Sequence, residues 1–348
     1  MASGQRALIR GMVASYPYVL KNVRAYFSNW YRRRILRTNV VKPYSAVFYA
    51  THKCNLDCTY CTQKNPEVFS EELDTARTIR VLHAIRRGVD TILFTGGEPL
   101  IRPDIEELVQ VARRDAKFLD VLLVTNGVLL DQKQGLLENL SGLIVSLDAI
   151  TPNRSRDLSK SSVVERVLDN LALVREKMKP RALTISCVLE EWNIGEAERI
   201  LDYCTEHGHV FSVQSAQDGL HPNFSLLYNP RYRAFVDRLV ELRAARKAPI
   251  NGGPRLLRTL LEFREFHCYP TMFPRVYPNG DVFYPCEPLR KIAGNLLEDR
   301  SFDQVFERGR KLYGDIPQCR SICYLFGNVL SSYYVEDFWG LAADYVRR

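Results

Sequence analysis

Three cysteines within one short loop constrain this chain more than any other feature. Cys54, Cys58 and Cys61 lie in the run Cys-Asn-Leu-Asp-Cys-Thr-Tyr-Cys. Iron–sulfur clusters are held by cysteine thiolates, and a [4Fe–4S] cluster usually takes four of them. If only three arrive, one iron keeps open positions where a small molecule can bind. The alternative is zinc, but zinc sites usually pair two Cys-x-x-Cys units, which this spacing fits poorly.

The residues around this loop predict a strand–helix–strand unit. An apolar run at 46–50 precedes the cysteines, a helical stretch follows at roughly 70–87, and a second apolar run occupies 91–94. The second run leads into Thr-Gly-Gly-Glu-Pro at 95–99. In a parallel sheet both polar segments would lie at the carboxyl ends of the strands, where reactive sites form. Taken alone, the Gly-Gly-Glu-Pro segment is also typical of an ordinary turn before a helix.

With both segments in place, the chain resembles the radical SAM superfamily over roughly residues 45–215. The hallmarks are Cys-x3-Cys-x2-Cys with an aromatic residue before the last cysteine, here Tyr60, and Gly-Gly-Glu-Pro after the second strand. The resemblance implies that the cysteine loop holds a [4Fe–4S] cluster. The amino and carboxylate groups of S-adenosylmethionine would then chelate the unique iron. The residues implied as ligands are Cys54, Cys58 and Cys61.

Further residues are implied for binding S-adenosylmethionine. Glycines expose backbone carbonyls, and a carboxylate accepts charge-assisted hydrogen bonds, so the Gly-Gly-Glu segment suits the methionine amino group. Polar groups also follow the third and fourth predicted strands. Similar proteins frequently place an arginine shortly after the fourth strand, where it holds the carboxylate of the cofactor. In this chain a lysine falls closest to that position, and lysine lacks the bidentate fork of arginine. A satisfied loop group is the alternative for each of the later residues. The candidates are Tyr60, Gly96, Gly97, Glu98, Thr125, Asn126, Ser146, Asp148 and Lys160.

Strands and helices alternate along the middle of the chain, which predicts an α/β fold. Strands are expected near 45–50, 90–95, 119–125, 142–148, 182–189 and 210–214. Helices are expected near 70–87, 103–114, 131–139, 161–178 and 193–207. The resemblance implies that these elements form a partial (β/α)6 TIM-like barrel over residues 44–217.

A second cysteine set follows a helical connector at 218–265. Pro-Asn-Gly-Asp within 276–284 predicts a hairpin turn, which can bring the cysteines on either side together. Residues 266–348 resemble the SPASM extension or its shorter form, twitch, which binds an auxiliary [4Fe–4S] cluster. A full SPASM domain carries seven cysteines, so the four found here fit twitch better, and a four-cysteine zinc site is the alternative. The implied ligands are Cys268, Cys286, Cys319 and Cys323.

Two cysteines remain outside these sets. Cys204 has apolar neighbours in a predicted helix, which indicates a core position. Cys187 is on a predicted strand, and a thiol facing the barrel interior can donate a hydrogen atom to a substrate radical, as resembling epimerases require. Packing in the core is the alternative reading of Cys187.

The positive charge of the chain is concentrated at its N-terminal end. Residues 1–43 hold nine Lys or Arg and no acidic residue, whereas the whole chain has 48 basic and 40 acidic residues. Apolar residues recur every three or four positions over 5–36, which predicts one or two helices divided at Pro17. Three interpretations stay open: a helix packed on the enzyme body, an interfacial helix on an anionic membrane surface, or a targeting segment.

The implied reaction begins with one-electron reduction of S-adenosylmethionine to methionine and a 5′-deoxyadenosyl radical, which abstracts hydrogen from a substrate. The outcome can be oxidation, epimerisation or bond formation, and an auxiliary cluster favours oxidation. A small metabolite, sugar or lipid is favoured over a peptide, because the 43 residues before the barrel are short for a peptide-recognition domain. The alternatives are a peptide-modifying enzyme and a non-enzymatic iron–sulfur electron carrier.

The expected partners are an electron donor such as flavodoxin or ferredoxin and an unidentified substrate, with a membrane surface as a further candidate and no nucleic acid. The chain shows no long apolar segment and no signal-peptide pattern, and nine cysteines in a chain of this length indicate metal or redox chemistry in a reducing compartment. We therefore expect a cytoplasmic protein, with peripheral membrane association as an open alternative.

Overall fold

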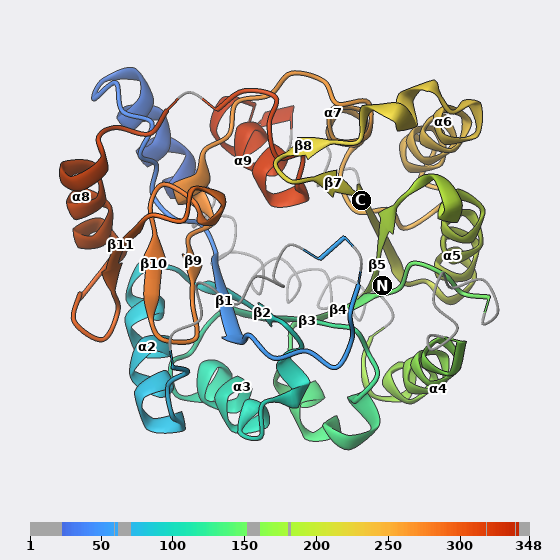
Figure 1. Ribbon diagram of the computed structural model, residues 1–348, viewed down its shortest axis with the longest axis horizontal. Helices are drawn as coiled ribbons and strands as arrows, with labels where there is room; N and C mark the ends of the chain where they lie inside the picture. The colour runs from blue at the N-terminus through green and yellow to red at the C-terminus, as the bar shows by residue number, and fades with distance from the viewer. Residues whose placement is uncertain are drawn as a thin grey trace, which may run out of the picture.

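In the computed structural model, a curved nine-stranded sheet forms the centre of the protein (Figure 1). The model describes residues 23–58, 60–61, 71–151, 161–179, 182–317, 319–337 and 339–340. The strand order is β11-β10-β9-β1-β2-β3-β4-β5-β6, and β1 to β6 all pair in parallel. Their bounds are β1 Ala46–Thr51, β2 Thr91–Gly96, β3 Asp120–Thr125, β4 Gly142–Ser146, β5 Leu183–Leu189 and β6 Val210–Ser215. These strands agree with the sequence prediction and confirm the partial barrel.

Four α-helices lie along the outer side of the parallel strands (Figure 1). They are α2 Thr75–Gly88, α3 Ile105–Arg114, α4 Ser161–Lys177 and α5 Ile194–His207. Asp74 caps α2 by accepting from the Arg77 N–H at 2.8 Å, and basic residues occupy the last turn of each helix, where the helix dipole favours them. The helix predicted over 131–139 is wrong in type, because this stretch forms two short 3-10 helices that leave and re-enter helical geometry at Lys133.

Each parallel strand has two faces with different burial. On β5, Ile185, Cys187 and Leu189 are buried in the main hydrophobic core, together with apolar residues of the outer helices. The residues between them, such as Thr184 and Ser186, are half-buried. Because successive strand residues point to opposite faces, the half-buried set lines the concave side of the sheet, where a barrel enzyme holds its substrate.

The C-terminal part of the chain adds to both the sheet and the open side of the barrel. Its elements are β7 Gln217–Asp218, β8 His221–Pro222, α6 Pro230–Ala244, α7 Pro254–Leu261, β9 Arg275–Val276, β10 Asp281–Phe283, β11 Ile292–Asn295, α8 Phe302–Tyr313 and α9 Phe326–Glu336. The predicted hairpin is present, because β9 and β10 are antiparallel. The structure also pairs β9 in parallel with β1, so this segment continues the barrel sheet.

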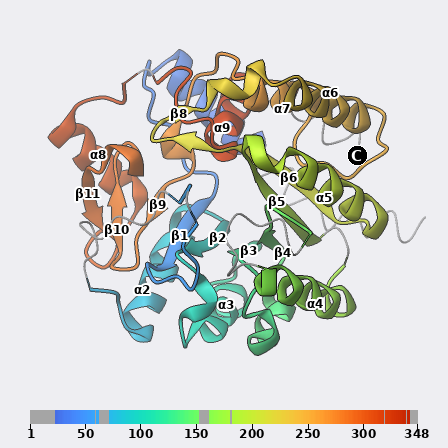
Figure 2. The same ribbon diagram turned by 45° about the vertical axis from the view of Figure 1, so that its right-hand side comes forward.

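Helix α9 lies across the opening between the β1 and β6 sides of the sheet (Figures 1 and 2). On one side the Phe326 N–H donates to Gln214 Oε1 of β6 at 3.4 Å, and on the other the Tyr269 N–H donates to Ser331 Oγ at 2.9 Å. Short 3-10 helices fill the connections at Pro99–Ile101, Leu130–Gln132, Gln134–Asn139, Glu191–Asn193, Phe224–Tyr228, Pro270–Met272 and Glu287–Leu289.

The N-terminal helix occupies residues 23–34 within the described part of the chain. Its predicted beginning and the expected division at Pro17 lie outside the described residues. None of the helices in the described ranges is both long enough and apolar enough to cross a membrane.

Candidate functional site

The loop carrying the first three cysteines begins where β1 ends, and it packs against the glycine turn after β2. The Gly97 N–H donates to Thr51 O at 2.8 Å, and the Glu98 N–H donates to Lys53 O at 2.7 Å. A Cβ atom at Gly97 would meet Lys53 O at 2.2 Å, and Gly96 has a φ of +140°. Two backbones approach here more closely than any side chain allows, so the glycines hold the base of the cysteine loop in place.

We expect Gly97→Ala to displace the cysteine loop, because its methyl group would collide with backbone oxygens that cannot rotate away. Iron retained per chain after anaerobic reconstitution should fall by about half or more, since the first cluster would lose its support. Gly327→Ala is the matched control, because its nearest new contact is a side-chain atom of Phe273 at 3.9 Å. Equal iron content in the two variants would contradict this role of Gly97.

The Glu98 carboxylate joins the ends of β2 and β3 instead of facing open space. It is 1% exposed and accepts hydrogen bonds from Thr125 Oγ1 at 2.7 Å, the Asn126 N–H at 2.7 Å and the Leu100 N–H at 3.0 Å. Burial raises the pKa of Glu98, while these three donors act in the opposite direction. The hydrogen bond between Glu98 and Thr125 therefore holds the ends of β2 and β3 together at the mouth of the barrel.

The cysteine loop is also connected to the ends of β3 and β4. Asn126 Nδ2 donates to Asn55 Oδ1 at 2.7 Å, and the Tyr60 hydroxyl donates to the Asp148 carboxylate. The Val188 N–H donates to the other Asp148 oxygen at 2.8 Å. Burial, followed by the charge of Asp148, raises the pKa of Tyr60, so the phenol stays protonated and remains a donor. The structure thus brings together the candidate residues of the loop, β3 and β4.

Two other candidates are placed differently. Ser146 ends β4 on the half-buried face, where it pairs in register with Ser186 of β5. Lys160 lies outside the described residues.

The thiols of the first set are accessible, since Cys54 is exposed and Cys58 and Cys61 are half-buried. The Cys61 N–H donates to Cys58 O at 3.2 Å, which forms a tight turn between these two ligands, and the Leu56 N–H lies 3.5 Å from Cys54 Sγ. Burial raises the pKa of Cys54, and the negative charges of Glu98 and Cys61 act in the same direction. Three reachable thiols in one loop, with a backbone N–H beside a sulfur, fit an iron–sulfur cluster.

The second cysteine set is brought together by backbone pairing between distant segments. The Cys268 N–H donates to Cys319 O at 3.0 Å, and the Cys323 N–H donates to Leu220 O at 2.8 Å. Burial raises the pKa of Cys268 to about 12, and the charges of the other three thiols, Cys286 first, act in the same direction. All four thiols therefore lie within electrostatic range of one another. In the described ranges, no three His, Cys, Asp or Glu side chains converge closely enough to hold a single metal ion.

A buried ion pair lies between the two cysteine sets, and sequence reasoning missed it. Arg275 of β9 contacts Glu287 at 2.7 Å, and their side chains are 17% and 12% exposed. The Tyr277 hydroxyl donates to the same carboxylate at 3.2 Å, and the Tyr277 ring packs on Tyr49 of β1 at 5.0 Å. Burial raises the pKa of Tyr49 to about 12, the charge of Arg275 acts in the opposite direction, and the charges of Glu287 and Cys61 act in the same direction as burial. Tyr49 thus lies within electrostatic range of both the Arg275–Glu287 pair and Cys61 of the first cysteine set.

Other supporting residues also lacked a local sequence signal. Arg102 is buried beneath the mouth and donates to Ala50 O at 2.9 Å and Leu73 O at 3.0 Å. Glu72 accepts from the Thr51 hydroxyl and the His52 N–H, both at 2.8 Å. These contacts fix the start of the cysteine loop, but they join positions that only the folded chain brings together.

Cys187 does not lie where a hydrogen donor to a substrate is needed. Its side chain is fully buried in the main core, on the face of β5 that packs against the helices. Burial raises its pKa well above the usual value, and Asn193 Nδ2 lies 3.9 Å from its sulfur. This placement corresponds to the core-packing alternative, and Cys204 is likewise buried in the core.

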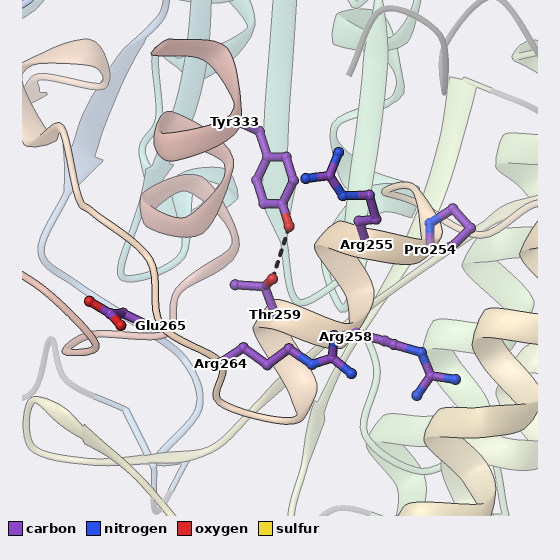
Figure 3. Close-up of a pocket in the computed structure, with 7 residues that line it drawn as sticks. All are labelled: Pro254, Arg255, Arg258, Thr259, Arg264, Glu265 and Tyr333. Carbon is purple, nitrogen blue, oxygen red and sulfur yellow. Dashed lines mark hydrogen bonds between the residues drawn. The ribbon is translucent and has the colours of Figure 1, made fainter. Parts of the chain in front are cut away.

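A surface pocket of about 380 Å³ lies between α7 and α9 (Figure 3). It is lined by Pro254, Arg255, Arg258, Thr259, Arg264, Glu265 and Tyr333. Its three arginines all pair with carboxylates, namely Asp337, Asp237 and Glu262. The pocket includes none of the candidate site residues, and its charges are already balanced within the protein.

Comparison with known protein sequences gives matches that cover less than half of the chain. Residues 48–204 match the family described as the Radical SAM superfamily. The GTP 3′,8-cyclase of Chlorobaculum tepidum is 38% identical over 120 residues, which cover 34% of this chain and 36% of that protein. The probable GTP 3′,8-cyclase of Methanocaldococcus jannaschii is 29% identical over 168 residues, covering 47% and 55%. The chain thus spans about half, or less, of the length of these relatives.

Solved structures with the same fold extend the similarity beyond the barrel. Streptococcus suis SuiB, bound to S-adenosylmethionine, superposes with a TM-score of 0.60 at 19% identity and covers 82% of this chain and 69% of that chain. The anSMEcpe structure with bound AdoMet gives 0.59 at 19% identity, covering 79% and 84%. The superfamily match and the donor set of the cysteine loop support a [4Fe–4S] cluster and S-adenosylmethionine as cofactors. Residues 48–204 therefore belong to the radical SAM superfamily.

Proposed function

We propose that this chain is an enzyme that reductively cleaves S-adenosylmethionine and abstracts a hydrogen atom from a small metabolite. The observation that carries this proposal is the close backbone contact between the cysteine loop and the glycine turn, which joins the ends of β1 and β2 at the barrel mouth. When bound, the cluster and S-adenosylmethionine supply the electron transfer and the 5′-deoxyadenosyl radical. The protein supplies binding, orientation and exclusion of water.

The roles of individual residues follow from what their side chains already contact. Cys54, Cys58 and Cys61 would hold the cluster. The Glu98 carboxylate already accepts three hydrogen bonds from the protein, so the backbone carbonyls of the glycine turn would share the methionine ammonium group with it. Asn126 and Ser146 offer further polar atoms at the ends of β3 and β4, and Asp148 orients Tyr60 of the cysteine loop. Lys160 keeps its proposed role toward the cofactor carboxylate.

The second cysteine set would bind an auxiliary [4Fe–4S] cluster, in a twitch-like segment formed by residues 266–348. Four thiolates complete the coordination of such a cluster, so it would pass electrons or support structure without binding substrate directly. Its connection to β1 through β9, and the Arg275–Glu287 pair between the two sets, support a role in the same reaction. An electron donor such as flavodoxin or ferredoxin would supply the first electron.

The concave face of the sheet supports a substrate that is recognised by hydrogen bonds. Ser146, Ser186 and Ser212 are register partners on β4, β5 and β6, so three hydroxyls lie in one row. Asn251 Nδ2 reaches Ser212 Oγ at 3.3 Å and extends this polar row. The six parallel strands carry no lysine or arginine. A hydroxyl-rich, uncharged metabolite fits this surface better than a triphosphate or a peptide chain.

The test is an anaerobic incubation of the reconstituted protein with S-adenosylmethionine and dithionite, followed by measurement of 5′-deoxyadenosine. We expect deoxyadenosine from the intact chain without added substrate, at a low rate. None would favour the electron-carrier alternative. Because its relatives are named GTP 3′,8-cyclases, GTP is the first substrate to add, and the absence of any GTP-derived product is the result we expect. A cyclised GTP product would overturn the proposed substrate class.

We expect Cys319→Ala to remove the auxiliary cluster and to leave the first cluster in place. Iron content should fall from about eight to about four per chain, while deoxyadenosine formation persists, because the first cysteine set is untouched. Cys204→Ala is the control, since this cysteine lies in the core and its loss should leave the iron content unchanged. Iron analysis and electron paramagnetic resonance of the reduced protein measure both outcomes. Full iron content in Cys319→Ala would remove Cys319 from the ligand set.

A further inference from the structure

The N-terminal helix presents its apolar side outward, which is the reverse of an ordinary surface helix. The most buried residue of the described helix is polar: Asn29 is 1% exposed and accepts from the Lys42 N–H at 2.8 Å. Arg33 donates to Asn39, and its guanidinium lies 5.0 Å above the Tyr269 ring. A helix that only covers the protein body would bury its apolar residues and expose its charges.

The outward side carries a cluster of large apolar side chains, which we call the aromatic patch. Its members are between 44% and 63% exposed, and they come from both ends of the described chain. They are Phe27, Trp30, Tyr31, Ile35, Leu36 and Trp339. Tyr26 connects the two parts, because its ring meets Trp339 edge to face at 6.0 Å. In Figure 1 the helix lies in blue at the outer edge of the molecule.

Exposed basic side chains lie on the same segment as most of the aromatic patch. Arg24, Arg34 and Arg37 are exposed, and within the described ranges none of them makes an ion pair with an acidic side chain. Helical periodicity places Arg24, Phe27, Tyr31 and Arg34 on one side of the helix. Aromatic side chains favour the headgroup region of a bilayer, and arginines beside them attract anionic lipids.

We propose that the aromatic patch docks this protein on an anionic membrane surface, with the helix lying in the plane of the interface. The complementary charge favours a lipid surface over a second copy of the chain, because the same arginines would repel one another across a symmetric dimer. Trp30 and Trp339 would sit among the headgroups, while the barrel stays in water. This inference does not depend on the proposed catalytic function.

The experiment uses the full chain and vesicles of phosphatidylcholine, with or without phosphatidylglycerol. We expect flotation with the anionic vesicles only, weakening as salt is raised. The double variant Trp30→Ser with Trp339→Ser should lower the partitioning of the protein onto vesicles at least about tenfold, because each substitution removes apolar surface that would enter the interface. Arg24→Gln and Arg34→Gln should each lower it about fivefold. Tyr228→Ser is the control, because Tyr228 is 83% exposed elsewhere on the molecule and should have no effect.

Tryptophan fluorescence provides a second readout that does not depend on flotation. The chain has three tryptophans, and the third, Trp192, donates to Glu190 within the body. In a Trp192→Phe protein, emission should shift to the blue on addition of anionic vesicles and be quenched by brominated lipid. No flotation and no shift would overturn the proposal. Equal flotation of the double tryptophan variant, or light scattering that shows a dimer with both tryptophans shielded, would also overturn it.

Discussion

Cys58→Ala is expected to reduce 5′-deoxyadenosine formation to the level of a reaction without enzyme. Cys58 is the middle one of the three proposed ligands. Its loss leaves two thiolates, which are too few to hold a [4Fe–4S] cluster. The loop itself should survive, because the Cys61 N–H donates to the backbone oxygen of residue 58, which alanine retains. The loss would therefore be one of metal binding and not of folding.

Two measurements separate these causes. The thermal unfolding midpoint of the iron-free variant should match that of the iron-free parent, while iron content falls by about half. Cys204→Ala again serves as the cysteine control, since its side chain is buried away from both sets. Wild-type deoxyadenosine formation in Cys58→Ala would show that the first cysteine set is not the site of S-adenosylmethionine cleavage.

Arg275→Met is expected to lower the free energy of unfolding by about 3–5 kcal/mol, because it leaves the Glu287 carboxylate buried without its cationic partner. The Tyr277 hydroxyl still donates to Glu287, but one neutral donor does not replace a guanidinium. Urea unfolding of the iron-free protein, under reducing conditions, measures the change. The exposed pair Arg238–Asp202 is the matched control, and Arg238→Met should cost less than about 1 kcal/mol.

The double variant Arg275→Met with Glu287→Met provides the sharper test. Replacing both partners of a buried ion pair by apolar side chains is often neutral, so most of the lost stability should return. If the double variant is as unstable as Arg275→Met, the cost comes from lost packing and not from an unpaired charge.

The sequence was sufficient for features that depend on neighbouring residues. The six parallel strands were predicted close to their observed bounds, because apolar runs bounded by turn residues are local signals. The cysteine loop and the glycine turn were predicted to meet because parallel strands end at one edge of a sheet. The hairpin at β9 and β10 followed from its turn residues. The pattern did not show that 131–139 would form 3-10 helices, because both helix types share similar local preferences.

The sequence by itself therefore determined the alternation of strands and helices, the positions of both cysteine sets and the basic character of the N-terminal segment, and the resemblance to a known superfamily implied the barrel. Only the tertiary structure decided that β9 joins the barrel sheet beside β1, that Arg275 pairs with Glu287 between the cysteine sets, and that Cys187 faces the core. It also decided that the N-terminal helix turns its aromatic side outward. The physical reason is that strand order, ion pairing and the choice of buried face depend on surfaces brought together by folding, and periodicity along the chain carries no information about which surface meets which.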